Sequence, residues 1–490
     1  MCIRDSSRPV SALASSALLY AGSSTRARIV RDLQITQLGD VRFGFMVNGV
    51  FSTRGHYATI ENNTLRLNNQ LLFGIDTVAV SNSAGTISCS AMMAPIPWQG
   101  EGTAAEPWLI TDKADMLALG KMTSESNVSF PGTYYKVTAD IDMEYDDTFN
   151  GISSTNTSGR VLFHGTFDGD GHTIHKLKIG RLAWTVRPED DPNGVGTVNT
   201  SANRATYIGL FGEIANDGIV RNVNIAADSK YEVFATAGSI AGNNYGLVEN
   251  CRNYADVWGF SSWIGGIVGQ VQKGGIVRDC YNAGNVTAGY RNAGGISSQS
   301  QGAVENCANT GNVSVISLYQ AAGKNSIRYA GGILGGLNGG RAVNCFNSGR
   351  VFALEGYAGG IVGTTPKATT SANFANDLTG NVNIGVVESG VTRYIGGISG
   401  GLGTDGTIEN NFYDASLNPM GAIESSPAPG MTGLGTRQLT SGTLPTGLET
   451  SLWSASADSY LIPAKHADEA ALQAVRHQYI LFADGEDRTH

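Results

Sequence analysis

A short glycine-rich phrase returns seven times between residues 208 and 401, and this repetition restricts the possible folds more than any other feature. The copies read IGLFG, AGSIAG, IGGIVG, AGGISS, AGGILGG, AGGIVG and IGGISGG. Their first glycines lie 29, 27, 29, 37, 28 and 37 residues apart, at Gly209, Gly238, Gly265, Gly294, Gly331, Gly359 and Gly396. A second phrase, as in GLVENCRN and GAVENCAN, follows each of several copies at a nearly fixed distance. A regular period of this length is typical of stacked repeats.

Three short strand-like segments alternate with glycine and asparagine turns in each repeat, and no helical pattern occurs between them. The chain has 65 glycines, and 15% of its residues are charged, which argues against helical repeats. Its 41% hydrophobic content argues against disorder. We therefore predict an all-β fold, a right-handed parallel β-helix of about seven coils with a small N-terminal β domain. The handedness rests on the general preference for right-handed crossovers.

Composition shifts divide the chain into five parts. Alternating apolar and polar residues predict a small β-sandwich-like domain, and APIPWQGEG reads as the linker after it. Thr111 or Asp112 can cap a short helix within the next part, which is expected to cover the first coil of the solenoid. The expected parts are an unstructured, artefactual or truncated start (1–20), the β domain (21–98), the N-terminal cap (99–206), the repeats with a C-terminal cover (207–460) and the beginning of a truncated further domain (461–490).

Residues at equivalent positions of stacked coils lie about 4.8 Å apart with parallel side chains. Four cysteines share one such position, and this geometry favours a ladder of free thiols over disulfide bonds. Four asparagines stand two residues after them and can form hydrogen bonds along the stack. The residues of the two ladders are Cys251, Cys280, Cys307 and Cys345, then Asn253, Asn282, Asn309 and Asn347.

Motifs for catalysis are weak. The His-Glu-x-x-His pattern of zinc peptidases does not occur in the sequence. His172 and His175 stand beside an Asp-Gly-Asp-Gly turn, but residues three apart in a strand point to opposite faces, so a turn and a solvent-facing strand explain them better than a metal site. Ser399 lies in a formal G-x-S-x-G match, yet sibling repeats carry valine or leucine in its slot, which indicates packing. We expect neither a cofactor nor a metal.

Aromatic residues precede the glycine phrase in five of its seven copies. They are Tyr207, Trp263, Tyr329, Tyr357 and Tyr394, with Thr236 and Asn292 in the other two positions. Stacked one per coil, the rings would form a column. Such rings either pack on one another and cover a corner of the solenoid, or offer a strip for sugar rings or a protein. We take this column as the candidate binding site.

The repeat phrase resembles the GLUG motif family of bacterial surface and secreted proteins, with IGLFGEI at 208–214 as the nearest match. EPWLITDKADMLAL, YYKVTADIDM and GTFDGDGHTIHKLKI resemble segments that precede such repeats, and the resemblance covers about residues 99–460. It implies an exported β-solenoid of the adhesin-like type. Similar repeats accompany immunoglobulin A1-specific metallopeptidases, whose zinc motif is a separate segment.

These observations predict a non-enzymatic surface module, outside or on a bacterial cell, that binds a host or matrix glycan or protein as part of a longer chain. A net charge of −9 without a basic cluster disfavours nucleic acid and anionic membranes as partners. No apolar run is long enough to span a membrane as a helix. Two alternatives stay open. One is a polysaccharide-processing β-helix enzyme, for which the acidic residues are too dispersed, and the other is a purely structural stalk.

Overall fold

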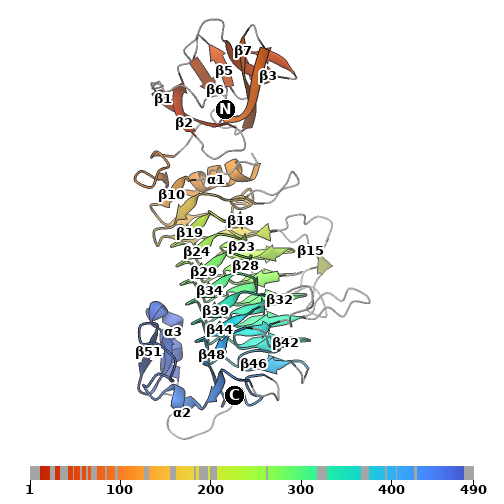
Figure 1. Ribbon diagram of the computed structural model, residues 1–490, viewed down its shortest axis with the longest axis vertical. Helices are drawn as coiled ribbons and strands as arrows, with labels where there is room; N and C mark the ends of the chain where they lie inside the picture. Colours follow the sequence, from red (N-terminus) through yellow and green to blue (C-terminus); the bar gives the residue numbers. More distant parts are fainter. Residues whose placement is uncertain are drawn as a thin grey trace.

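A stack of short parallel strands forms most of the molecule (Figure 1), which confirms the all-β, parallel β-helix prediction. The structure is a computed structural model. The right-handed sense of the β-helix stays a prediction. It describes the strands and short turns within residues 12–93 and then residues 98–125, 132–154, 162–180, 184–186, 197–198, 207–260, 263–316, 328–365, 375–391, 394–403, 406–423 and 428–478.

Each repeat makes five short strands where the sequence indicated three. The glycine phrase is bent at its centre, so it contributes the end of one strand and the start of the next, which belong to different sheets. Glycine is needed at this bend because a Cβ atom at Gly266 would meet the carbonyl oxygen of Gly295 at 2.1 Å. Strands at equivalent positions of successive coils stack into five parallel sheets. We name the sheets A to E in the order in which the chain passes through them within one repeat, starting at the glycine phrase.

Sheets A and B flank the glycine bend. Sheet A contains β17 (Tyr207–Ile208), β22 (Thr236–Ala237), β27 (Trp263–Gly265), β32 (Asn292–Gly294), β37 (Tyr329–Gly331), β42 (Tyr357–Gly359) and β47 (Ile395–Gly396). Sheet B contains β18 (Phe211–Ile214), β23 (Ala241–Asn244), β28 (Val268–Val271), β33 (Ser297–Ser300), β38 (Leu334–Leu337) and β43 (Val362–Thr364).

Sheets C, D and E complete each coil. Sheet C contains β9 (Trp108–Ile110), β10 (Tyr134–Val137), β12 (Thr166–Asp168), β19 (Ile219–Arg221), β24 (Leu247–Glu249), β29 (Ile276–Arg278), β34 (Ala303–Glu305), β39 (Arg341–Val343), β44 (Asp377–Thr379) and β48 (Ile408–Glu409). Sheet D contains β11 (Ile141–Asp142), β13 (Thr173–His175), β20 (Asn224–Ile225), β25 (Arg252–Asn253), β30 (Tyr281–Asn282), β35 (Ala308–Asn309), β40 (Phe346–Asn347), β45 (Val382–Asn383), β49 (Asn411–Asp414) and β50 (Met431–Leu434). Sheet E contains β14 (Lys178–Ile179), β21 (Lys230–Val233), β26 (Val257–Gly259), β31 (Val286–Ala288), β36 (Val313–Val315), β41 (Val351–Ala353) and β46 (Val387–Ser389).

The stack begins before the first glycine phrase. Tyr135 of β10 pairs in parallel with Trp108 of β9, and Phe167 of β12 pairs with Val220 of β19. The region expected as a separate cap (99–206) therefore contributes strands to the stack itself, which gives sheet C ten strands against the seven copies of the phrase. The two strands β15 (Trp184–Val186) and β16 (Thr197–Val198) form a small antiparallel pair.

Helix α1 (Lys113–Glu125) covers the N-terminal end of the solenoid core (Figure 1). Asp112 caps it, because its Oδ1 accepts a hydrogen bond from the backbone N–H of Asp115 at 3.0 Å. The Asp115 carboxylate in turn accepts one from the backbone N–H of Thr111 at 2.8 Å. The buried face of the helix joins the core cluster through Met116, Leu119 and Met122.

An asparagine or aspartate turns the chain between sheets C and D with a left-handed backbone. The residues and their φ angles are Asn222 (56°), Asn250 (50°), Asp279 (55°), Asn306 (52°) and Asn344 (54°). Asparagine and aspartate tolerate this conformation better than other residues with a side chain. Their side chains are also linked, since Asn250 donates to Asn222 at 2.7 Å and Asn222 to Asp168 at 2.8 Å. Sequence reasoning missed this corner, although its signal is the residue directly before each ladder cysteine.

The core consists of columns of identical or similar apolar side chains, one per coil. Fully buried isoleucines follow the glycine phrase in six coils: Ile240, Ile267, Ile296, Ile333, Ile361 and Ile398. Fully buried valines of sheet C face them in four: Val220, Val248, Val277 and Val304. Burial of each such side chain contributes about 1.5–3 kcal/mol. The cores of neighbouring coils are therefore continuous, and both ends need covering.

A buried asparagine ladder runs through sheet D. Each Nδ2 donates to the Oδ1 of the asparagine in the next coil at 2.7–2.8 Å, along Asn253, Asn282, Asn309, Asn347 and Asn383. The other proton of each Nδ2 goes to the carbonyl oxygen two residues later, for example from Asn309 to Gly311 at 2.8 Å. All five side chains are fully buried. The hydrogen bonding along the stack that the sequence predicted is confirmed, with Asn383 as an additional member.

The N-terminal region forms an antiparallel sheet of six strands. In spatial order they are β2 (Arg28–Leu33), β1 (Ala12–Ala21), β8 (Gly85–Met93), β7 (Gly74–Asn82), β3 (Arg42–Val47) and β4 (Val50–Ser52). A separate hairpin contains β5 (Ala58–Glu61) and β6 (Thr64–Leu67). Strand β1 corrects the expectation of an unstructured start, because Tyr20 pairs with Met92 and Ala12 with Leu33.

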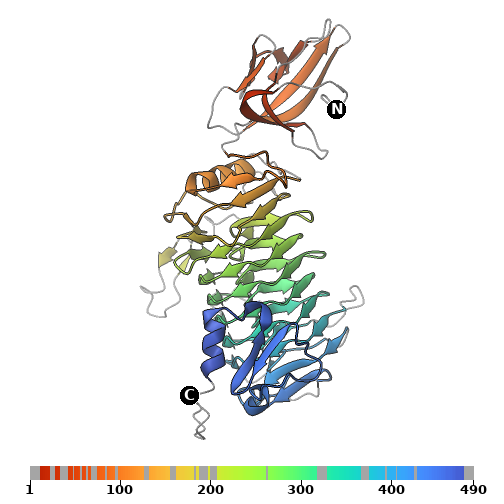
Figure 2. The ribbon, with the colours of Figure 1, turned by 90° about the vertical axis from the view of Figure 1, so that its left-hand side faces the viewer.

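The C-terminal segment lies along the side of the solenoid, where the sequence indicated a cover over its last coil (Figure 2). It contains α2 (Thr436–Leu439), the antiparallel hairpin of β51 (Trp453–Ser456) and β52 (Ser459–Pro463), the 3-10 turn η3 (Ala464–His466) and α3 (Ala470–Gln478). The expected further domain from 461 is therefore wrong for residues 461–478, which belong to this segment, and residues 479–490 lie outside the described part.

Apolar side chains on the outer face of sheet D hold this segment. They come from Tyr281, Ala308, Phe346, Val382 and Phe412 and join Leu439, Trp453, Tyr460, Leu461, Ile462 and Leu472 in one buried cluster. Polar contacts fix its far end, since Glu469 accepts hydrogen bonds from Arg252 Nε at 2.6 Å and from the Tyr254 hydroxyl at 2.8 Å. In the part that the structure covers, no helix is long and apolar enough to cross a membrane.

We expect the asparagine ladder to be a main source of stability. Replacing Asn309 by Ala removes the acceptor of Asn282 and the donor to Asn347 and to Gly311, which leaves buried polar groups unpaired. The loss should be about 2–4 kcal/mol of unfolding free energy, measured by urea denaturation. Asn312→Ala, at an exposed corner of the same coil, is the control and should cost less than about 1 kcal/mol. Equal losses would contradict the assignment.

We also expect acid to weaken the docking of the C-terminal segment. His466 is 1% exposed and its ring stacks on Tyr281 at 5.8 Å, while Nε2 lies 3.0 Å from the Asn306 carbonyl oxygen. Burial lowers the pKa of His466 below its ordinary 6.5, against the opposing effects of the Asn306 hydrogen bond and of Glu469, with Arg252 also lowering it. The undocked segment therefore binds a proton that the docked one excludes, and docking is lost as pH falls below about 6.5.

Hydrogen exchange of β52 and α3 amides, corrected for the intrinsic effect of pH and compared between about pH 7.5 and about pH 5, measures this loss. His466→Gln, which cannot titrate, should lose most of the dependence. Identical responses of the two proteins to pH would rule out His466 as the cause.

Candidate functional site

The predicted aromatic column exists in register along sheet A. Trp263 pairs with Asn292, Asn292 with Tyr329, and Tyr329 with Tyr357. Tyr207 pairs with Thr236 at the N-terminal end of the same sheet. The two non-aromatic positions therefore divide the column into Tyr207, Trp263 and a group of three tyrosines.

The three tyrosines contact one another directly. The rings of Tyr329 and Tyr357 lie 5.5 Å apart between centroids at an angle of 50°, and those of Tyr357 and Tyr394 lie 4.2 Å apart at 28°. The second pair is stacked, so each of its rings covers one face of the other. One face of Tyr357 and one face of Tyr394 are consequently covered within the column.

Exposure increases toward the C-terminal end of the column. Tyr207, Trp263, Tyr329 and Tyr357 are half-buried, while Tyr394 is 41% exposed. Burial raises the pKa of Tyr329 and of Tyr357 above the usual value for a phenol, and for Tyr357 the neighbouring tyrosines raise it further. The phenolic hydroxyls therefore keep their protons at neutral pH and are able to donate hydrogen bonds.

Two arginines stand directly before sheet A, next to Trp263. The Arg291 guanidinium carbon lies 5.3 Å from the Trp263 ring centroid and 5.5 Å from that of Tyr290. In the next coil, Arg328 Nε donates to the Tyr290 carbonyl oxygen at 3.1 Å, and its guanidinium lies 6.0 Å from the same ring. With its amide turned, Asn292 accepts a hydrogen bond from Trp263 Nε1 at 3.3 Å. The column is thus flanked by cationic and amide groups.

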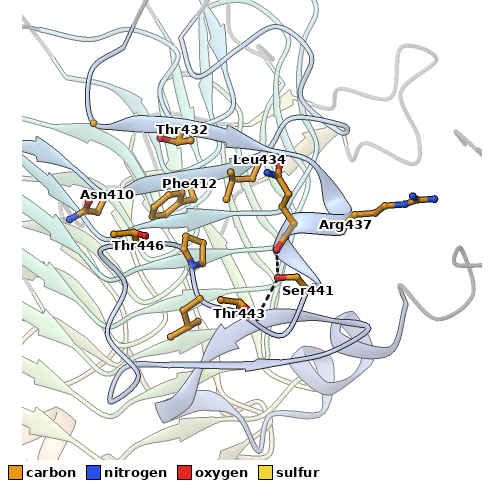
Figure 3. Close-up of a pocket in the computed structure, with 12 residues that line it drawn as sticks. Asn410, Phe412, Thr432, Leu434, Arg437, Ser441, Thr443 and Thr446 are labelled. Carbon is orange, nitrogen blue, oxygen red and sulfur yellow. Dashed lines mark hydrogen bonds between the residues drawn. The ribbon is translucent and has the colours of Figure 1, made fainter.

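A hollow of about 690 Å³ opens between the last coil and the C-terminal segment (Figure 3). Asn410, Phe412, Thr432 and Leu434 line one side and Ser441 to Thr446 the other, while Arg437 points away from it. Its twelve lining residues include no aspartate, glutamate, histidine or cysteine. A second hollow, of about 350 Å³, lies between corner residues such as Asp279 and the loop around Lys465. Among its described lining residues, the first holds no pair of groups that could act as acid and base, and the second holds the ion pair of Asp279 and Lys465 at 4.0 Å.

The other positions with possible chemistry have structural partners. His172 Nδ1 lies 3.3 Å from Asp140, whereas His175 Nδ1 lies 3.7 Å from Asp228, so the two histidines do not converge. Ser399 is fully buried, and its hydroxyl donates to the Gly401 carbonyl at 2.8 Å. This agrees with its interpretation as a packing residue. Among the described side chains, no group of three or more His, Cys, Asp or Glu is placed to hold a metal ion.

Acidic residues on the outer face of sheet C alternate with arginines. In register along the stack they are Asp168, Arg221, Glu249, Arg278 and Glu305. Arg221 Nε lies 2.8 Å from Asp168, and Arg278 Nε lies 2.6 Å from Glu249. The carboxylates are therefore neutralised pairwise along the stack.

The four ladder cysteines are free and fully buried. Each Sγ lies 3.2–3.4 Å from the carbonyl oxygen two residues earlier, for example that of Glu305 for Cys307. Burial raises the pKa of the Cys251 and Cys307 thiols. The predicted free-thiol ladder is confirmed, and these thiols are shielded from reagents in solution.

Comparison with known proteins finds distant similarity. No family model matches the chain. It is 27% identical over 197 residues to halomucin of Haloquadratum walsbyi, a match that covers 39% of this chain and 2% of halomucin. It is 29% identical over 154 residues to a "putative Gly-rich membrane protein" of Evansella cellulosilytica, over 31% of this chain and 15% of that protein. The chain thus spans a small part of the relatives that it matches.

Two solved structures also match. A crystal structure of a "putative immunoglobulin A1 protease" from Bacteroides ovatus has a TM-score of 0.46 and 20% identity, over 75% of this chain and 94% of that one. A structure named IgA1 Protease has a TM-score of 0.38 and 12% identity, over 76% of this chain and 28% of that one.

We expect the ladder cysteines to resist alkylation in the native protein. Iodoacetamide followed by peptide mass spectrometry should leave Cys251, Cys280, Cys307 and Cys345 unmodified without denaturant and modify all four in urea, because only thiolates in contact with solvent react. Strong native labelling of any one of them would contradict the burial of the ladder. If all four become labelled at the urea concentration at which half of the protein is unfolded, their exposure results from unfolding of the solenoid.

Proposed function

We propose that this chain is a non-enzymatic, surface-displayed module that binds a glycan through the aromatic column of sheet A. The observation that carries the proposal is the register of Trp263, Asn292, Tyr329, Tyr357 and Tyr394 along one edge of a rigid solenoid. Half-exposed aromatic rings and phenolic hydroxyls side by side are groups that sugars bind, because a sugar ring has both an apolar face and a hydroxyl rim.

A surface location has separate support. One relative is named halomucin and the other is named a membrane protein. Placing this chain outside the cell, as part of a longer surface protein, follows from these names and from the resemblance of its repeats to GLUG-type proteins. A partner from a host or a matrix belongs to the same proposal.

The absence of enzymatic activity belongs to the proposal too. The paired carboxylates of sheet C, the hydrogen-bonded Ser399 hydroxyl and the absence of an acid-base pair among the described residues that line the hollow beside the last coil all support it. The contact between Tyr357 and Tyr394 supports the alternative of a structural stalk, since rings that stack on each other cover part of the surface that a ligand would use. The binding experiment therefore has to separate binding from packing.

A glycan array probed with the wild-type chain and with the Tyr329/Tyr357/Tyr394→Ala variant makes this separation. We expect the variant to lose at least about tenfold in affinity for whichever glycans the wild type binds, because the rings would supply the anchoring contacts. Phe352→Ala is the matched control. It removes a half-buried aromatic ring from sheet E, away from the column, and should bind as the wild type does.

Circular dichroism and the melting temperature of each variant show whether it is folded. If the triple variant unfolds, Tyr394→Ala replaces it, because this ring is the most exposed of the column and its removal disturbs the core least. Equal binding by the wild type and the folded variant would leave the stalk as the better description.

A further inference from the structure

Among the described residues, Arg291, which lies beside the column, lacks an acidic partner of the kind that the neighbouring Arg328 has. Arg291 forms no ion pair with any residue that the structure describes, and its buried Nε has no hydrogen-bond acceptor there. Buried N–H groups of a guanidinium are normally paired, and an unpaired one is costly. Residues 317–327, which lead from sheet E to Arg328 in the next coil, contain no aspartate or glutamate.

Arg328 shows what a satisfied arginine at the same corner of the solenoid looks like. It is 8% exposed, donates to the carbonyl oxygen of Tyr290 at 3.1 Å and forms an ion pair with Glu355. The two arginines occupy equivalent positions in consecutive coils, since Tyr329 N–H donates to the Arg291 carbonyl and Tyr357 N–H to that of Arg328. The backbone carbonyls of the two arginines therefore accept equivalent hydrogen bonds, and the two residues differ in the partners of their side chains.

The Arg291 side chain is nevertheless held in place. The rings of Trp263 and Tyr290 lie 5.3 and 5.5 Å from its guanidinium carbon, and Tyr290 is itself 8% exposed. Stacking on aromatic faces orders a guanidinium and leaves its N–H groups, which lie in its plane, directed outward. Two aromatic rings therefore hold the Arg291 side chain, which remains partly exposed.

The local charge is positive in a chain of net charge −9. Arg291 and Arg328 share the Tyr290 ring, and Glu355 compensates one of them. A planar, ordered guanidinium with an uncompensated charge favours a carboxylate, which it binds with two parallel hydrogen bonds. Because Arg291 directly precedes Asn292 of the column, an anion bound there would lie beside the Trp263 ring.

We infer that the ligand of the column is an acidic glycan, and that Arg291 binds the carboxylate of one of its uronic acid units while Trp263 contacts the sugar ring. This inference rests on the proposed function and specifies its ligand class. Trp263 and Arg291 are then the part of the column that selects the ligand. The tyrosines extend the contact along the glycan.

The test compares uronic acid oligosaccharides with their carboxyl-reduced, neutral counterparts on one array. The wild type should bind the acidic member of a pair at least about tenfold more tightly, as expected for a hydrogen-bonded charge pair. Arg291→Met keeps the apolar stem between the two rings and removes the charge, so it should abolish the preference for the acidic member. Arg341→Met, which removes an arginine paired with Glu305 on sheet C, should keep the preference.

Each outcome decides the question. Equal binding of acidic and neutral members by the wild type, or a preference that persists in Arg291→Met, overturns the inference while the proposed function stands. Absence of binding to every glycan overturns both. If Arg291→Met does not fold, Arg291→Lys keeps a charge without the planar fork and should reduce the preference severalfold. Free galacturonic acid competing as well as the oligosaccharide would show that the carboxylate alone is bound, and would also overturn the assignment to a glycan.

Discussion

Stacking at one fixed spacing is the constraint on which the rest of the structure depends. A side chain inside a parallel β-helix has the equivalent side chain of the next coil as its nearest neighbour, so every buried residue must pack or bond with a copy of itself. Asparagine meets this condition because its amide both donates and accepts. The chain from Asn253 to Asn383 uses this property in five coils, and isoleucine and cysteine meet the same condition by packing alone. The left-handed corner at Asn250 and its equivalents bends each coil without interrupting the stack.

A stack of this kind leaves two ends and several outer faces, and the chain covers them in different ways. Helix α1 covers the N-terminal end through a buried apolar face. The C-terminal segment folds back along sheet D and ties Glu469 to Arg252, 217 residues away in the sequence. On sheet C the outer face is stabilised by alternating charges such as Glu249 and Arg278. Sheet A differs, because its edge carries aromatic rings and an arginine without an acidic partner in the described residues, and the proposed binding site rests on this difference.

The sequence predicted the interior far better than the ends. Ladders of cysteine and asparagine follow from the period alone, because equivalent residues must meet in any stack. The sequence also indicated correctly that Ser399 is a packing residue, because equivalent positions in other repeats carry valine or leucine. It missed the division of each repeat into five strands, since strands of two or three residues carry no periodicity of their own. It also did not predict helix α3, because this helix is set by packing against β52 and the solenoid.

The period by itself determined that the chain forms a parallel solenoid, which residues lie inside it and which residues share a column. These follow from local, repeated interactions between neighbouring coils. Only the tertiary structure decided where the C-terminal segment lies, how the column rings use their faces, and which of two equivalent arginines, Arg291 or Arg328, has a partner. Those features depend on residues that differ from coil to coil, such as the Glu355 that pairs with Arg328, or on contacts of a segment outside the repeats, so the repeat pattern does not predict them.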